Sequence, residues 1–181
     1  MRIVTLLTVV SLALVLSLAR ADDTLVKFDG GIGVDPVSNA PGPGAVAATV
    51  TRNIVRGVQP PGAPWVIAEL KAEVKDDGRI AVDGRGLVFA AGDTIGTALV
   101  LTPTGGTAAS LNVFATLICE NVAPFVERNT SPVPLAANGD FKIDDVLSPP
   151  PPQRSSCATP VLLIRNAGNR NWFAAGIQKF D

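Results

Sequence analysis

The sequence of 181 residues contains no histidine and no tyrosine, and it has only two cysteines and one methionine. Without histidine the chain has no imidazole general base, no Ser/His/Asp or Cys/His nucleophile system, and no histidine-ligated zinc or copper. Two cysteines are too few for an iron–sulfur cluster or a structural zinc site. These absences predict a protein that is not an enzyme, has no catalytic residues and needs no cofactor.

Long hydrophobic runs are also lacking, except at the N-terminus. Residues 3–19 are uncharged and mostly apolar, and Ala19-Arg20-Ala21 places small residues at the two positions that a signal peptidase reads. We therefore expect residues 1–21 to be a signal peptide that is cleaved before Asp22. The alternative is a retained membrane anchor, for which the run falls short of the roughly 20 apolar residues that span a bilayer. Cleavage predicts a secreted or periplasmic protein without an integral membrane segment.

Charge is scarce and nearly balanced. Charged residues make up 17% of the chain, with 15 Lys and Arg against 16 Asp and Glu. Removal of residues 1–21 takes away Arg2 and Arg20, which leaves 13 basic against 16 acidic residues and a net charge of minus three. A slightly acidic chain without basic clusters argues against nucleic acid or an anionic membrane as the partner.

The two cysteines, Cys119 and Cys157, both lie in the part that is expected to be exported. In an oxidising compartment an even count favours one intramolecular disulfide, which would stabilise the fold by roughly 4 kcal/mol at most. The alternative is two separate buried thiols.

The most informative segment is 65–89, in which apolar and charged residues alternate. A helix there would stack Glu69 on Glu73 and Lys71 on Lys75, two like-charge pairs four residues apart. A hairpin avoids these clashes, so we predict a hairpin.

In that hairpin Asp76-Asp77-Gly78 forms the turn, with Gly78 in a left-handed conformation. Opposite charges then face each other across the two strands, Lys71 with Asp83 and Glu69 with Arg85. On the other face Val74 is expected opposite Ile80, and Ala72 opposite Val82.

At the end away from the turn the same register makes both faces apolar. It places Ile67 beside Leu87 and Trp65 beside Phe89. Another sheet of the same molecule or a partner must cover them. Together with Trp172, these residues are our candidate ligand or assembly surface.

The remaining strands are expected to be short and separated by Gly/Pro-rich breaks. We predict an N-terminal strand at 24–28, a Gly/Pro-rich connection up to residue 44, and a single β domain over 45–181. Within that domain we predict strands at 46–58 and 111–119, a hairpin over 133–147 with Ala137-Asn138-Gly139 as its turn, and a pair formed by 161–164 and 172–177. In the second hairpin we expect Leu135 opposite Phe141 and Val133 opposite Ile143. This pattern is typical of an all-β antiparallel β-sandwich, with a small β-barrel as the alternative.

Carboxylates are the remaining candidates for catalysis or metal binding. Glu69, Glu73 and Asp83 share one face of the predicted hairpin, and paired carboxyl groups are what a glycosidase needs. Alternating Glu and Lys is, however, the ordinary pattern of a solvated strand. Asp140, Asp144 and Asp145 are weak calcium candidates, because their spacing does not match an EF-hand loop.

Two further ideas concern binding. The strand at 24–28 could complete the sheet of a neighbouring copy and join subunits, or it could pair within its own chain. Trp65 or Trp172 could instead serve as a platform for a sugar ring, although tryptophan is more often a core residue in so aromatic-poor a chain.

Three motifs, at 30–38, 64–67 and 171–177, give the chain a resemblance to a group of exported bacterial proteins without an assigned activity. The resemblance implies export and a single domain, and it carries over no site residues. Our leading hypothesis is therefore a secreted, non-enzymatic β protein with a structural or surface-binding role, whose partner is a second copy or a surface glycan or protein. The alternative is a glycan-binding module or a carbohydrate-active hydrolase.

Overall fold

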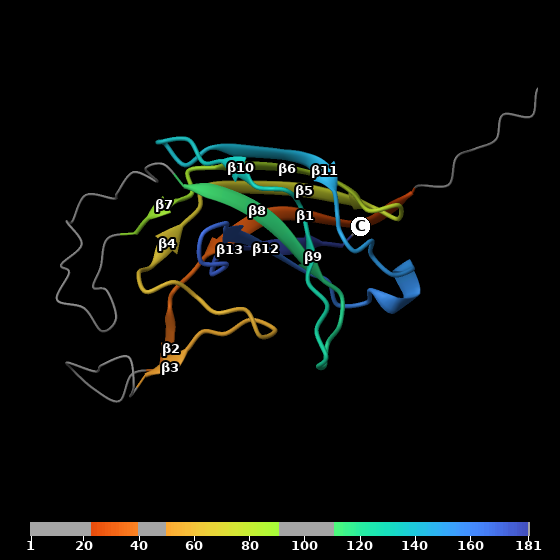
Figure 1. The fold of residues 1–181 in the computed structure, drawn as a ribbon, viewed down its shortest axis with the longest axis horizontal. Helices are drawn as coiled ribbons and strands as arrows, with labels where there is room; N and C mark the ends of the chain where they lie inside the picture. The colour runs from red at the N-terminus through yellow and green to blue at the C-terminus, as the bar shows by residue number, and fades with distance from the viewer. Residues whose placement is uncertain (1–22, 40–49, 91–110, 181) are drawn as a thin grey trace, which may run out of the picture.

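The computed structural model describes residues 23–39, 50–90 and 111–180 (Figure 1). Within these residues the chain forms strands joined by turns and loops, with one short 3-10 helix, η1 (Arg154–Ser156). The all-β antiparallel fold that we predicted is confirmed. The strands are β1 (Thr24–Gly33), β2 (Val37–Asn39), β3 (Thr51–Arg52), β4 (Trp65–Val66), β5 (Glu69–Lys75), β6 (Arg79–Arg85), β7 (Val88–Phe89), β8 (Asn112–Ile118), β9 (Arg128–Asn129), β10 (Val133–Pro134), β11 (Phe141–Val146), β12 (Val161–Asn166) and β13 (Trp172–Lys179).

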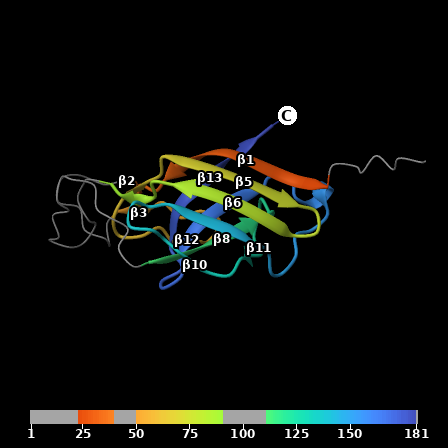
Figure 2. The same cartoon turned by 90° about the horizontal axis from the view of Figure 1, so that it is seen from above.

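Nine of these strands form one antiparallel sheet in the order β10-β8-β12-β13-β1-β5-β6-β11, with β9 beside β8. The sheet curls, so that β1, β5, β6 and β11 form an upper layer in Figure 1 while β8, β12 and β13 run beneath them. Figure 2 looks onto the upper layer, whose strands lie side by side. The two halves thus face each other, as in a sandwich or a half-barrel.

The core lies between these two halves. On the upper layer Phe28, Ala72, Val82 and Ile143 occupy matched positions on four neighbouring strands, and all are buried. The lower layer contributes the inward residues of β8 and β12, namely Val113, Ala115, Leu117, Leu162 and Ile164. All of these belong to one hydrophobic cluster, whose burial is the main driving force for the fold.

The predicted hairpin over 65–89 is confirmed in detail. Residues Lys71 and Asp83 are paired across β5 and β6, as are Glu69 and Arg85, and the apolar pairs also stand in the predicted register. Gly78 has a φ of 89°, the left-handed conformation that the turn requires. At the end of the hairpin away from the turn the same register continues into β4 and β7, where Trp65 is paired with Phe89.

The predicted hairpin over 133–147 is wrong, although its turn forms. The amide of Ala136 donates to the carbonyl of Asp140, and that of Gly139 donates to Ala136. Beyond this turn the arms separate, because β10 pairs with β8 and β11 pairs with β6. Pro132 and Pro134 have no N–H, so the segment before the turn cannot donate from these two positions to β11. Strands β10 and β11 are consequently the two edges of the large sheet.

Strand β1 is longer than predicted. We expected 24–28 as a strand and an irregular connection from residue 30, but β1 continues through a bulge to Gly33. Glycine is required here because the backbone approaches its neighbours closely. A Cβ atom on Gly33 would lie 2.1 Å from the carbonyl oxygen of Trp65, and one on Gly31 would lie 2.9 Å from Leu70 Cβ.

Strand β1 lies between β13 and β5 of its own sheet, as the within-chain alternative required. The pair predicted from 161–164 and 172–177 is confirmed as β12 and β13, with Leu163 opposite Ala175. Of the strand predicted at 46–58, residues 46–49 lie outside the described residues. Residues 50–58 do not form one strand, because they contribute only β3 and a bridge between Val55 and Val58.

The predicted disulfide between Cys119 and Cys157 is confirmed, with a Cα–Cα distance of 4.5 Å. It joins the end of β8 to the segment after η1. The described part of the chain contains no helix with the length and apolar character needed to span a bilayer.

Candidate functional site: a charged sheet face

The surface predicted from Trp65, Ile67, Leu87, Phe89 and Trp172 is part of the core. Trp65 is 2% exposed and Trp172 is 4% exposed, while Ile67 and Phe89 are half-buried against the main cluster. The Trp65 ring stacks on Phe173 of β13 at a centroid distance of 3.9 Å. The apolar second face of this hairpin end is thus covered by the same molecule, and neither tryptophan is exposed as a sugar platform.

The three calcium candidates do not converge. Asp140 lies in the turn before β11, where its carboxylate accepts from the Gly86 amide and from Asn138. Asp144 and Asp145 are adjacent on β11, so their side chains point to opposite faces of the sheet. Asp145 accepts from the Ser131 amide at 2.6 Å, and this bond lowers its pKa. Among the described residues no group of three or more His, Cys, Asp or Glu could hold a metal ion.

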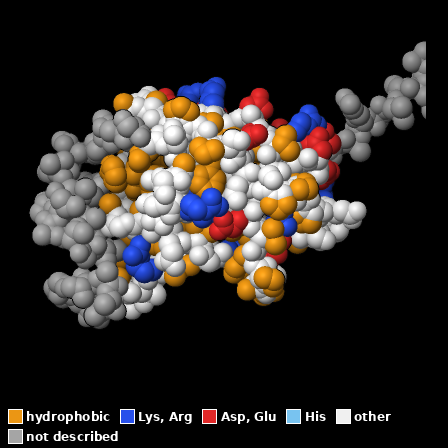
Figure 3. All heavy atoms as spheres, viewed as in Figure 1, with side chains coloured by type: hydrophobic (Ala, Val, Ile, Leu, Met, Phe, Trp, Pro, Cys, Tyr) orange, Lys and Arg blue, Asp and Glu red, His pale blue; other side chains and the backbone are white. Residues whose placement is uncertain are grey.

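A different surface has the stronger claim to function, the outer face of β1, β5, β6 and β11. One row across these strands reads Asp29, Lys71, Asp83 and Lys142, with alternating charge. The next row reads Lys27, Glu73, Ala81 and Asp144, and Glu69 and Arg85 form a third pair. We call these ten residues the charged face. In Figure 3, side chains of both signs lie along the upper rim, over the strands that Figure 1 labels β6 and β11.

The charged face is hollowed near its centre. A depression of about 460 Å³ is lined by both main rows and by Lys179 at the end of β13. The row between them also lines it, namely Phe28, Ala72, Val82 and Ile143. Ala81 stands between Glu73 and Asp144 in its row, and its single methyl group leaves space that a longer side chain would fill. The hollow is therefore surrounded by charges of both signs, with a small apolar residue between two carboxylates.

Two carboxylates of this face, those of Asp83 and Glu73, have lowered pKa values. Lys142 Nζ lies 3.1 Å from Asp83 Oδ2, and this contact lowers the pKa of Asp83. Glu73 accepts from Thr24 Oγ1 at 2.6 Å and from Lys75 Nζ at 2.9 Å, and both bonds lower its pKa. A glycosidase needs one carboxyl group with a raised pKa as its general acid. The contacts of Asp83 and Glu73 have the opposite effect, so this arrangement suits binding rather than proton transfer.

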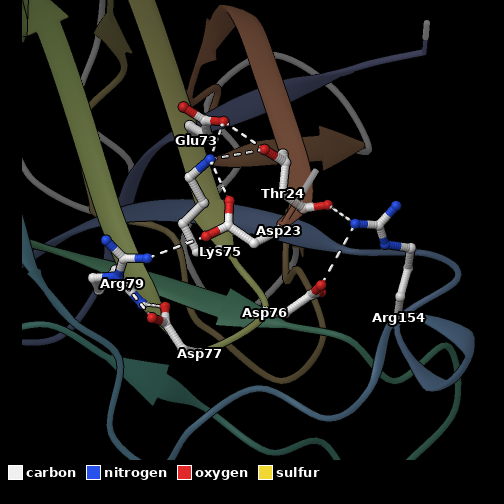
Figure 4. A network of polar contacts seen from close by, with 8 residues as sticks. All are labelled: Asp23, Thr24, Glu73, Lys75, Asp76, Asp77, Arg79 and Arg154. Carbon is white, nitrogen blue, oxygen red and sulfur yellow. Dashed lines mark hydrogen bonds and ion pairs between the residues drawn. The ribbon is translucent and has the colours of Figure 1, made fainter. Parts of the chain in front are cut away.

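A network at the turn of the β5–β6 hairpin holds one end of the charged face in place (Figure 4). Lys75 contacts Asp23 at 3.0 Å as well as Glu73, and Arg79 contacts both Asp23 and Asp77. The Arg154 guanidinium donates to the Thr24 carbonyl. The start of β1, the hairpin turn and η1 are thereby linked, which fixes the position of Glu73 beside the hollow.

The loop between β8 and β9 carries a second set of charges, which sequence reasoning missed. Arg128 is 7% exposed and lies 2.8 Å from Glu120, while Arg165 is 4% exposed and lies 2.7 Å from Glu127. The Arg165 guanidinium also stands 5.3 Å from the centre of the Phe114 ring. One signal was available, because Phe114 and Ile118 share a face with Asn112 and Thr116 in the strand predicted at 111–119. The two arginine side chains are buried, so these cations are not accessible to a partner.

No protein-family model, no curated protein and no solved structure matches this chain. The resemblance to exported bacterial proteins therefore stays a prediction, and function must be argued from the geometry alone.

Proposed function

We propose that this protein is an exported, non-enzymatic β domain that binds a charged partner at a surface through its charged face. The observation that carries the proposal is the hollowed sheet face, on which cations and anions alternate in register across four neighbouring strands. Such a face favours a partner that also presents both signs, a protein or a zwitterionic glycan. A polyanion such as nucleic acid would be repelled by about half of these residues.

Three further observations support this proposal. The pKa values of Asp83 and Glu73 are lowered, which disfavours acid–base catalysis by them. Both tryptophans are buried, which disfavours sugar stacking. The Cys119–Cys157 disulfide is compatible with an oxidising compartment, where exported proteins fold.

The experiment measures binding of residues 22–181 to an array of zwitterionic glycans, acidic glycans and mixed-charge peptides. The test variant carries Lys71→Gln and Asp83→Asn together, which removes the central pair without changing the net charge. The control is Asn121→Ala, an exposed position in the loop between β8 and β9. We expect the double variant to lose at least about tenfold in affinity for a mixed-charge probe, while the control binds like the natural protein.

Binding that survives the double variant would refute the charged face as the site. Turnover of a glycan or an ester that Glu69→Gln or Glu73→Gln abolishes would replace the proposal with a hydrolase.

A further inference from the structure

We propose that a second copy of this chain is a partner of the charged face, so that two copies form an isologous dimer sheet to sheet. This inference rests on the proposed function, because it uses the same surface and names its occupant.

The charges of this face follow a regular order about a line between β5 and β6. Strands β1 and β11 lie at equal distance from this line, because β1 pairs with β5 and β11 pairs with β6. Across the line Lys71 corresponds to Asp83, and Glu69 corresponds to Arg85. Each charge on one side of the hairpin thus has an opposite charge at the mirrored position.

The outer strands β1 and β11 follow the same rule, although β5 and β6 separate them in the sheet. Lys27 on β1 corresponds to Asp144 on β11, and Asp29 corresponds to Lys142. The fifth position pairs Glu73 with the uncharged Ala81, where the hollow lies. None of the five correspondences brings two like charges together.

A twofold axis along this line would place β1 of one copy over β11 of the other, and β5 over β6. In an isologous interface each contact occurs twice, so the four oppositely charged pairs give eight complementary contacts. Sheets that pack face to face keep their strands within about 30° of each other, which preserves the order of the rows. Charge complementarity of this kind selects a partner and its orientation.

The contacts are exposed, and this determines the strength of the dimer. Lys142 is 80% exposed and Arg85 is 61% exposed. Exposed ion pairs contribute little each and are screened by salt. We therefore expect a weak dimer that salt dissociates, rather than a permanent one.

Lys27 and Asp144 give the sharpest test. Neither residue has an ion pair or side-chain hydrogen bond within the described part of the chain, and the charge of Lys27 is only one of several causes that lower the pKa of the partly exposed carboxylate of Glu73. Reversing either charge should therefore leave the fold intact. In a homodimer of Lys27→Glu or of Asp144→Lys, two like-charge contacts appear. In a mixture of the two variants, both contacts are again between opposite charges.

The measurement is sedimentation velocity of residues 22–181 over a range of concentrations, at about 50 mM and about 500 mM salt. We expect the natural protein to dimerise at low salt, each single variant to associate at least about tenfold more weakly, and the equimolar mixture to form a heterodimer. A chain carrying both substitutions has the original net charge and should dimerise like the natural protein. Thermal unfolding of each variant checks that the fold is retained.

A natural protein that stays monomeric at low salt would overturn the inference, and so would a dimer that the two single variants do not weaken. Binding of the protein to the mixed-charge array would still support the proposed function in either case. If the protein dimerises but does not bind the array, the dimer is supported and the proposed function is refuted. The charged face then recognises only a second copy of the chain.

Discussion

Two regions of this molecule pair cationic side chains with carboxylates, and they differ in burial. On the charged face the Lys142 side chain is 80% exposed beside Asp83, whereas behind the loop after β8 the Arg165 side chain is 4% exposed beside Glu127. The buried pairs link the β8–β9 loop to the sheet, while the exposed pairs remain in contact with water.

The physical reason is the cost of removing charge from water. A buried guanidinium that loses its carboxylate is left without compensation, which destabilises a protein strongly. An exposed pair that breaks is solvated at once, so it contributes little to folding. Three predictions test this difference, in order of decreasing effect on stability.

The largest effect is expected at Glu127, which contacts Arg165 and also Arg170. Burial raises the pKa of Glu127, but the hydrogen bonds from the two arginines outweigh it and lower the pKa below its usual range. We expect Glu127→Gln to destabilise the protein by about 3 kcal/mol in urea unfolding, because Arg165 keeps its charge in a buried place.

The control for this prediction is the double variant Glu127→Gln with Arg165→Met, which removes both members of the pair. It should recover part of the lost stability. If Glu127→Gln alone costs less than about 1 kcal/mol, water reaches Arg165. The contributions of the two regions' ion pairs to stability would then differ less than their burial indicates.

An intermediate effect is expected at Glu120, and it depends on pH. Hydrogen bonds from Arg128 lower the pKa of Glu120 from its ordinary value of 4.5 to about 2. Since the folded pKa is depressed, the stabilisation is complete above about pH 4.5 and is lost as the pH falls toward 2. We expect Glu120→Gln to cost about 2 kcal/mol at pH 7.

The measurement is urea unfolding of the natural protein and of Glu120→Gln at several pH values. The difference between the two proteins should shrink from pH 4.5 to pH 2. A difference that does not change over this range would mean that the Glu120–Arg128 pair does not stabilise the fold.

The smallest effect is expected on the charged face. Lys142→Gln removes an exposed partner of Asp83, whose pKa the lysine lowers. We expect no measurable change in the thermal unfolding temperature, because both groups are solvated after the pair is broken. A clear drop would show that the face stabilises the fold and would argue against its being free for a partner.

Sequence reasoning succeeded where the information is local. The β5–β6 hairpin could be predicted because Lys71 and Glu69 stand in register with opposite charges only if the turn is at Asp76-Asp77-Gly78. The disulfide followed from a count of two cysteines. The central part of the charged face was therefore visible in the sequence.

The missed features depend on contacts between distant segments. The turn at 136–140 forms as predicted. Its two arms, however, pair with other strands, β10 with β8 and β11 with β6, and this pairing depends on the curl of the whole sheet. The burial of Arg165 likewise depends on residues distant in the sequence, Phe114 on β8 and Glu127 in the loop after it. Neither set of partners is fixed by residues that are close together in the sequence.

The position of β1 has a consequence for the order in which the molecule can fold. Its neighbours are β5 and β13, and β13 consists of Trp172–Lys179, almost at the end of the chain. A chain that emerges from its N-terminus first cannot enclose β1 between both neighbours until β13 has been synthesised. Such long-range pairing is slow to form. The arrangement therefore delays completion of the sheet until β13 is available to pair with β1.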